Sequence, residues 1–294
     1  MLGPFRERAR DSRRWLAQLW SGALDLALPP TCAGCAAPIQ ARDALCEHCD
    51  RRLPRLADDS CALCQAVRVT SAAGLSAGPS GGLCASCEFA LSPLAACVAA
   101  VAFSGDVESW IHRFKYPRAG LAGLDPAPRS VVEALVCEAA GRVTGPAPGL
   151  VVPVPLHPSR LRSRGFNPAA LLARSVARRY GLRYDPVALR RTRPTQSQTS
   201  LDRAARRRNV RAAFRTRRRW RAPECVWLLD DVVTTGSTLS ECARALRRAG
   251  VKTVVGICAA RTMGSGQQTG SRSASSTEIL SRRLQTPPAA TDAR

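Results

Sequence analysis

The sequence predicts an α/β protein whose parallel sheet is preceded by a small metal-binding unit and followed by a disordered tail. From residue 95 to 261, short apolar runs alternate with segments of helical periodicity, which is typical of a parallel sheet covered by helices. Four Cys-x-x-Cys pairs precede this region. Residues 262–294 carry only scattered apolar side chains, and such a composition does not bury a core.

The order of the expected elements fits this fold class. Short continuous apolar runs predict buried strands, and apolar residues three or four apart predict helices that pack on the sheet. We expect strands at 97–103, 150–154, 187–190, 225–229 and 251–260. We expect helices at 107–114, 130–143, 167–180 and 202–209, and another that starts at Thr238 and ends before Gly250. Ligands of such sheets bind at the carboxyl ends of the strands.

The charge of the chain is strongly basic. Its 294 residues include 44 basic and 22 acidic side chains, which gives a formal net charge of +22. Lys115 and Lys252 are the only lysines in the sequence, so arginine carries nearly all of the positive charge. A surface this basic predicts polyanionic partners, either nucleic acid or phosphorylated metabolites.

Residues 1–28 form a distinct N-terminal segment with an apolar stripe at helical spacing. Gln18 and Asp25 interrupt its apolar part, and no usual cleavage site precedes Pro29, so we do not expect a signal peptide. No apolar run in the sequence reaches the length needed to cross a bilayer, and we expect no transmembrane segment. We interpret the segment as an amphipathic helix docked on its own protein, with binding to a membrane surface as the alternative.

Eight of the thirteen cysteines form four Cys-x-x-Cys pairs within residues 29–90. Such a pair places two thiolates on a tight turn, and two pairs complete a tetrahedral zinc shell. We therefore predict a double zinc ribbon, in which sequential pairing of the four turns is the simplest arrangement and interleaved pairing remains open. A redox role for the pairs is the alternative. We expect His48 to lie beside the second pair without binding metal. The predicted zinc ligands are Cys32, Cys35, Cys46, Cys49, Cys61, Cys64, Cys84 and Cys87.

The segment VWLLDDVVTTGST, residues 226–238, combines a buried strand with a small-residue loop and a helix start. Thr238 and Glu241 fit a capping box for that helix. A hydroxyl-rich loop before a helix N-terminus is suited to a phosphate, and Asp230 and Asp231 are suited to ribose hydroxyls or to a divalent cation. A solvated strand end is the alternative. The segment resembles the signature of type I phosphoribosyltransferases, which implies binding of 5-phosphoribosyl 1-pyrophosphate (PRPP) with Mg²⁺. The residues concerned are Asp230, Asp231, Thr234, Thr235, Gly236, Ser237 and Thr238.

A second candidate loop occupies residues 151–167, with the sequence VVPVPLHPSRLRSRGFN. Its prolines restrict the backbone, and its arginines offer forked donors for pyrophosphate oxygens. We predict that this loop holds the pyrophosphate of PRPP, and a solvated basic loop is the alternative. His157 is either a general acid toward the leaving group or a structural histidine. The predicted contacts are Pro155, Leu156, His157, Arg160 and Arg164.

A basic segment precedes the phosphate-binding strand. Thirteen arginines and a single acidic residue, Asp202, occur from residue 190 to 221. Such a segment fits a lid that closes over a polyphosphate, and it fits equally well a surface that follows a nucleic-acid backbone. Phe214 and Trp220 are its only large aromatic residues, which favours electrostatic contact over base stacking.

Taken together, the motifs resemble those of the ComF family. Four Cys-x-x-Cys pairs, FKY at 114–116, VPVPLHPSRLRSRGFN, NVRAAF at 209–214 and LLDDVVTTGST follow one another in that order. The resemblance covers about residues 20–261 and implies a double zinc ribbon joined to a type I phosphoribosyltransferase domain at residues 95–261. It further implies a bacterial cytoplasmic protein with a part in natural transformation, whose partners are single-stranded DNA and the DNA-uptake machinery. It identifies no catalytic residue, and a non-catalytic DNA-handling module is the alternative to a transferase.

Overall fold

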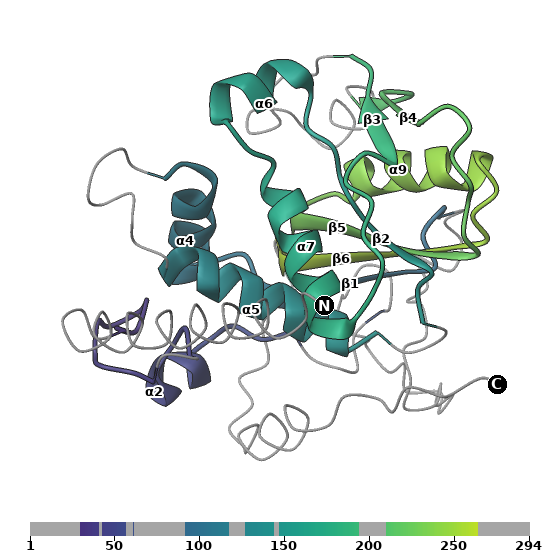
Figure 1. Ribbon diagram of the computed structural model, residues 1–294. Coiled ribbons are helices and arrows are strands. Elements are labelled where there is room, and N and C mark those ends of the chain that lie inside the picture. The colour runs from purple at the N-terminus through teal and green to yellow at the C-terminus, as the bar shows by residue number, and fades with distance from the viewer. Residues whose placement is uncertain are drawn as a thin grey trace, which may run out of the picture.

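The computed structural model describes residues 30–40, 43–56, 61, 92–117, 127–143, 147–193 and 210–263. Their centre is a four-stranded parallel sheet (Figure 1), as the sequence predicts. The order of its strands is β1 (Ala96–Ala102), β6 (Thr253–Arg261), β5 (Cys225–Val233) and β2 (Leu150–Pro153). The longest strands, β5 and β6, therefore lie in the middle, where both faces are covered.

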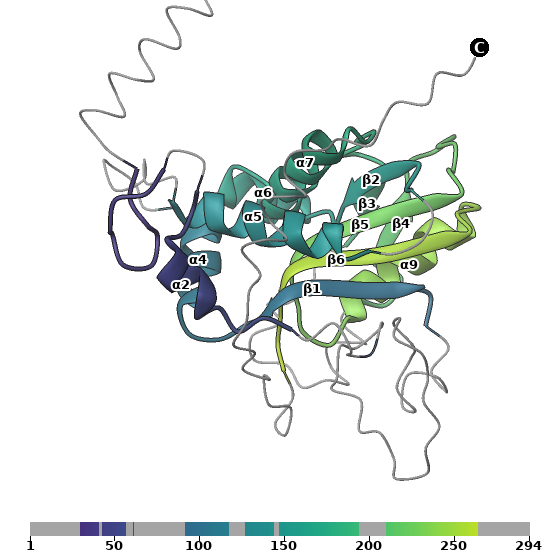
Figure 2. The same ribbon diagram turned by 90° about the horizontal axis from the view of Figure 1, so that it is seen from below.

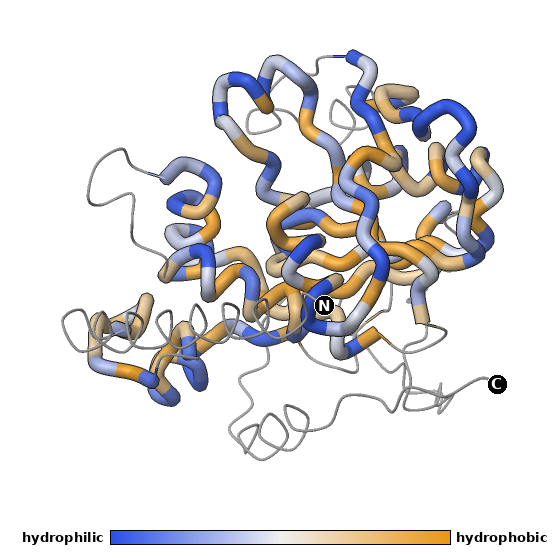
Figure 3. Tube along the Cα trace, in the orientation of Figure 1, coloured by the Kyte–Doolittle hydropathy of each residue, from blue (hydrophilic) through white to orange (hydrophobic). Residues whose placement is uncertain are grey.

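Helices cover both faces of this sheet, as Figure 2 shows. One face is covered by α5 (Ala127–Gly141) and α7 (Pro168–Tyr180), with α4 (Asp106–Lys115) packed against α5. The other face is covered by α9 (Ser237–Arg248), on which the antiparallel pair β3 (Leu189–Arg191) and β4 (Phe214–Thr216) packs. Hydrophobic residues gather on the sheet and on the helix faces turned toward it (Figure 3).

Strand β5 shows why both faces need this cover. Successive side chains of a strand point to opposite faces, so Val226 and Leu228 pack on the α9 side, whereas Trp227 and Leu229 pack on the α5 and α7 side. All four are buried. The continuous apolar run predicted from the sequence is therefore a strand buried on both sides.

Three predicted elements differ from the structure. Strand β5 runs on to Val233, so Asp230 and Asp231 lie within its second half rather than after it, and Asp230 pairs with Cys258 of β6. Part of the proline-rich loop is a short helix, α6 (Pro158–Arg164), with Pro158 at its first turn and Gly165 in the left-handed conformation at its end. The strand predicted at 187–190 exists as β3, but it pairs with β4 and not with the parallel sheet.

The first zinc ribbon, which includes α2 (Glu47–Arg51), is tied to the α/β domain by hydrogen bonds and ion pairs. Its last residues pair with β1, where Leu56 N donates to Ala100 O over 3.1 Å. Arg55 bridges Asp50 of the ribbon and Glu138 of α5, and the indole N–H of Trp110 donates to Ala33 O over 3.1 Å. The ribbon is thus held beside α4 and α5.

The helices predicted at 1–28 and 202–209 and the disordered tail at 262–294 lie outside the described residues, apart from Thr262 and Met263. Within the described part of the chain, no helix is long and apolar enough to cross a membrane.

Candidate phosphate-binding site and metal centre

The first two Cys-x-x-Cys turns come together as one metal-binding cluster. The Sγ atoms of Cys32, Cys35, Cys46 and Cys49 all lie within 4.8 Å of one another, and the Sγ atoms of Cys35 and Cys46 are 3.6 Å apart. Sulfur atoms bound to a tetrahedral zinc at about 2.3 Å are themselves about 3.8 Å apart. The residues therefore fit a structural zinc ion, and the sequential pairing is confirmed for this ribbon.

Backbone groups around the cluster favour thiolates. The N–H groups of Gly34 and Cys46 donate to Cys32 Sγ over 3.4 and 3.2 Å. Burial raises the pKa of this thiol, but hydrogen bonds from the backbone outweigh that effect and lower it to about 6. Burial and the neighbouring sulfur atoms raise the pKa of Cys49 to about 12, so the four thiols do not all ionise without a cation. A bound Zn²⁺ supplies the charge that stabilises four thiolates together.

Gly34 leaves room for the metal-binding turn. A Cβ at this position would lie 2.8 Å from the Sγ of Cys49, a distance that forces the sulfur to move. His48 is exposed and does not belong to the cluster. Of the second ribbon, Cys61 is buried, and Cys64, Cys84 and Cys87 lie outside the described residues.

The carboxyl end of β5 carries the acidic pair. The N–H of Val154 donates to Leu229 O over 2.8 Å, so the chain just after β2 still lies beside β5 at the residue before Asp230. This contact brings the two candidate loops to the same edge of the sheet, as expected for a parallel α/β fold. Successive strand residues face opposite sides, and the two carboxyl groups therefore meet different partners.

Asp231 pairs with Lys115, a residue that was not predicted from the sequence to belong to the site. Its Oδ1 lies 2.9 Å from the Nζ of Lys115 at the end of α4. Burial lowers the pKa of Lys115, but the charge of Asp231 outweighs it and the pKa is raised. The guanidinium of Arg164 stacks on the ring of Tyr116 at 4.5 Å from its centre, and Tyr116 is more than half exposed. The FKY segment was the available sequence signal for this contact.

Asp230 lies in a different electrostatic setting. Burial, followed by the charge of Asp231, raises its pKa to about 7, although Lys115 and Arg191 act in the opposite direction. The N–H of Asp231 donates to its Oδ1 over 2.9 Å. Burial and the charge of Arg160 lower the pKa of Arg191, and the charge of Asp230 counteracts them. Arg160 acts on the pKa of Arg191, and Arg164 acts on that of Lys115, the two cations whose charges oppose the raised pKa of Asp230.

The loop after β5 turns into α9 as the sequence pattern suggests, but the cap differs. Gly236 is the N-cap, in the left-handed conformation with φ +69°, and as a glycine it offers no side chain to cap the helix. The Oγ1 of Thr235 lies 2.7 Å from the Oγ of Ser237 and also accepts the N–H of Ser237 over 3.4 Å. A left-handed glycine before a helix N-terminus presents backbone N–H groups to an anion.

The capping box predicted from Thr238 and Glu241 is wrong. Glu241 is buried one turn into the helix, where its Oε2 accepts the N–H of Ala212 over 2.8 Å and its Oε1 pairs with Arg244. Its role is to fasten the segment before β4 onto α9. The helix starts at Ser237 because Gly236 can take the positive φ that the turn requires.

The remaining predicted contacts occupy the second loop. Pro155 is buried, whereas Leu156 and His157 are half-buried. His157 is the N-cap of α6, and its Nδ1 accepts the N–H of Ser159 over 3.3 Å. This position fits the structural reading of the histidine. Thr234 is exposed at the tip of the other loop.

Comparison with known proteins places these features in a family. A family model described as "Double zinc ribbon domain" matches residues 23–88. DNA utilization protein YhgH of Salmonella typhi is 32% identical over 240 residues, which cover 81% of this chain and the whole relative. The chain belongs to the ComF family. Competence protein F of Haemophilus influenzae is 35% identical over 109 residues, 36% of this ComF-family chain and 48% of the relative.

Among solved structures, the chain is matched to the glutamine PRPP amidotransferase of B. subtilis complexed with ADP and GMP. It is 21% identical, its TM-score is 0.34, and the match covers 50% of this chain and 30% of that one. The fold class expected of a ComF-family protein is confirmed within the described residues, since a parallel sheet flanked by helices follows a four-cysteine zinc ribbon.

Proposed function

We propose that this ComF-family protein binds PRPP together with Mg²⁺ at the carboxyl ends of β2 and β5. The observation that carries the proposal is the acidic pair Asp230 and Asp231 close before the start of α9, whose N-cap is the left-handed Gly236. In this proposal the loop 234–238 binds the 5-phosphate through backbone N–H groups and hydroxyls. The two carboxylates bind the ribose hydroxyls or the Mg²⁺ ion, which prefers oxygen ligands.

The pyrophosphate of PRPP is assigned to the second loop in the same proposal. Arg160 and Arg164 belong to α6, their charges act on Arg191 and Lys115, and forked guanidinium donors match phosphate oxygens. Pro155 and Leu156 would shape the loop, and His157 would orient its helix start. Lys115 balances Asp231, so that the pair presents less than two negative charges to a polyanionic ligand.

The relatives supply the biological setting of the proposal. Their printed names refer to DNA utilization and to competence, and we place this protein in the uptake or use of DNA. The second ribbon, with Cys61, Cys64, Cys84 and Cys87, would hold a second zinc ion. Thiolate zinc sites persist in reducing compartments, which supports a cytoplasmic location.

Calorimetric titration with PRPP and Mg²⁺ tests this function. We expect saturable binding by the full chain and its loss in the Asp230→Asn, Asp231→Asn double variant, with zinc content unchanged. Exchange of two exposed residues in the ribbon, Asp43→Asn and Glu47→Gln, alters charge equally and should leave binding intact. Normal binding by the first double variant would show that the ligand lies elsewhere.

A second function is favoured by the arginine excess, namely a DNA-handling module that holds PRPP without turning it over. Phosphoribosyl transfer proceeds through a charge-stabilised centre and needs no covalent nucleophile, so both readings share the same site. They differ in one product. A transferase releases pyrophosphate when PRPP is supplied with the right base or amine, and a screen of such acceptors separates it from a module that binds PRPP and releases none.

A further inference from the structure

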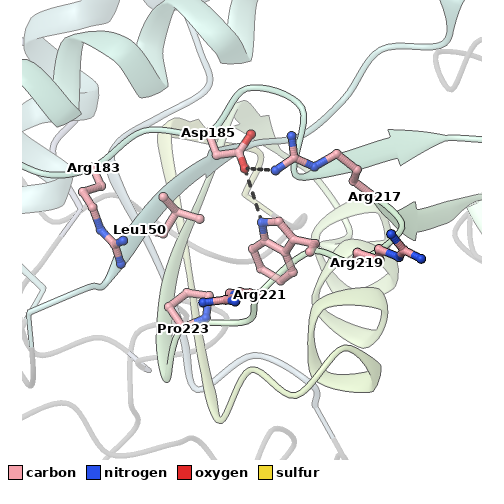
Figure 4. Close-up of a pocket in the computed structure, with 8 residues that line it drawn as sticks. Leu150, Arg183, Asp185, Arg217, Arg219, Arg221 and Pro223 are labelled. Atoms are coloured by element: carbon pink, nitrogen blue, oxygen red, sulfur yellow. Dashed lines mark hydrogen bonds and ion pairs between the residues drawn. The ribbon is translucent and has the colours of Figure 1, made fainter.

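An arginine-lined pocket lies at the amino ends of β2 and β5 (Figure 4). Its volume is about 370 Å³, which is within the range of small-ligand pockets. Four of the eight residues that line it are arginines, and one is acidic. The lining consists of Leu150, Arg183, Asp185, Arg217, Arg219, Trp220, Arg221 and Pro223.

The pocket is separate from the proposed PRPP site. Leu150 begins β2 and Pro223 precedes β5, whereas Asp231 lies near the end of β5. A strand rises by about 3.3 Å per residue, so the chain from Pro223 to Asp231 spans roughly 25 Å. A PRPP molecule bound at the acidic pair does not reach this edge of the sheet. The arginines of the pocket therefore need an explanation of their own.

Asp185, the single acidic residue of the pocket, fixes the positions of its neighbours. The Oδ2 of Asp185 accepts the indole N–H of Trp220 over 3.3 Å and pairs with Arg217 over 3.5 Å. Its Oδ1 accepts the N–H of Val187 over 3.0 Å. Asp185 thus fixes one aromatic ring and one guanidinium in the wall, and its charge is shared between them. Arg183 is fixed separately, because its Nε donates to Gly149 O over 3.0 Å.

The backbone on the opposite wall is also held in an unusual conformation. Arg219 has φ +58°, in the left-handed region that a side chain with a Cβ adopts at a cost of roughly 1–2 kcal/mol. This conformation lies between Arg217, which pairs with Asp185, and Trp220, whose indole bonds to the same carboxylate. Strain of this kind persists where surrounding contacts fix it. Here it places Arg219 and Arg221 in the wall of one pocket together with Trp220.

We propose that this pocket binds the phosphate group of a nucleotide, with Trp220 as the surface on which the base stacks. Guanidinium groups from several directions suit phosphate oxygens, and an aromatic face held by its N–H offers sequence-tolerant stacking. The same chemistry is offered by a free nucleoside monophosphate and by the backbone of a single strand. The site is independent of PRPP binding, since it occupies the opposite edge of the sheet.

Two exposed arginines of the pocket, Arg219 and Arg221, provide the test, because their side chains lie outside the core and form no ion pair within the described residues. We would compare the full-length double variant Arg219→Gln, Arg221→Gln with Arg51→Gln, Arg52→Gln, which removes the same charge from the exposed surface of the zinc ribbon. The probes are a fluorescent 15-nucleotide deoxythymidine strand, an abasic strand of equal length and thymidine 5′-monophosphate. Binding is measured by anisotropy or calorimetry at salt concentrations from about 50 to about 200 mM.

The pocket variant should bind the deoxythymidine strand about tenfold more weakly than the control variant. The slope of log affinity against log salt should fall by about 1.4, since each phosphate contact with a single strand contributes about 0.7. The wild-type protein should bind the abasic strand at least about fivefold more weakly than the deoxythymidine strand, because the stacked base is missing.

The three probes also distinguish the sources of the phosphate. A parallel loss of thymidine monophosphate binding supports a site that accepts free nucleotides, and a loss confined to the strand supports a site for the nucleic-acid backbone. Equal affinities of the pocket and control variants for both ligands would overturn the proposal. So would a pocket variant that loses only PRPP binding, and an abasic strand that binds as well as deoxythymidine would overturn the role of Trp220.

Discussion

Binding of PRPP should be coupled to ionisation of Asp230. The pKa of this carboxyl group is raised to about 7 by burial and by the charge of Asp231, so about half of the molecules carry a proton there at pH 7. Contact with Mg²⁺ or with ribose hydroxyls favours the ionised form. Ligand binding should therefore release about 0.9 proton at pH 6, about 0.5 at pH 7 and about 0.1 at pH 8.

The sign of the pH effect follows from the same linkage. Because the ligand prefers ionised Asp230 and the free protein holds the proton, affinity should rise with pH up to about 7 and then level off. Calorimetry at one pH in two buffers of different ionisation enthalpy gives the number of protons released. PRPP saturated with Mg²⁺ is used throughout, so that metal binding by the free ligand adds no pH dependence of its own.

Variants separate the protons released by Asp230 from those released by the ligand. Asp230→Asn has no proton to release, and whatever release remains belongs to PRPP. Asp43→Asn, an exposed change in the zinc ribbon, should match the wild type. Proton release that does not vary with pH would show that Asp230 does not ionise on binding, and so would an Asp230→Asn variant that binds PRPP and releases as many protons as the wild type.

Three further substitutions probe the site and the zinc ribbon. Lys115→Met leaves the buried carboxylate of Asp231 without its partner at 2.9 Å and should lower the free energy of unfolding by about 2 kcal/mol in urea denaturation; an unchanged midpoint would contradict this. Gly34→Ala places a Cβ 2.8 Å from Cys49 Sγ and should speed zinc release to a colorimetric chelator. A variant that releases zinc as slowly as the wild type would argue against the tight turn. Gly236→Ala forces a side chain into φ +69° and should cost about 1 kcal/mol of stability and weaken PRPP binding, whereas a neutral result would remove Gly236 from the anion site.

The parallel sheet could be predicted from local patterns because its strands are buried on both faces. Continuous apolar runs at 97–103, 150–154 and 251–260 correspond to β1, β2 and β6, and the helical periodicity of 167–180 corresponds to α7. The metal-binding cysteines of the first ribbon could be predicted equally well, because the spacing of a Cys-x-x-Cys pair alone determines that two sulfur atoms share a turn.

Contacts between distant residues could not be predicted in the same way. The partner of Glu241 is the N–H of Ala212, which is 29 positions away, so a local capping pattern gave the wrong role. The sequence pattern indicates only that Lys115 ends a helix, and it is the packing of α4 that brings this residue to Asp231. Helix α6 had a usable local signal in Pro158 and Gly165, but its polar sequence has no apolar periodicity.

Hydrogen exchange with and without PRPP and Mg²⁺ tests the location of the ligand most directly. A ligand held by backbone N–H groups slows the exchange of those amides. We expect strong protection at residues 234–240 and weaker protection at 155–164, with no change at 217–221 in the arginine-lined pocket. Saturation with PRPP that leaves 234–240 unprotected, or that protects 217–221 instead, would contradict the assignment of the site to the carboxyl end of β5.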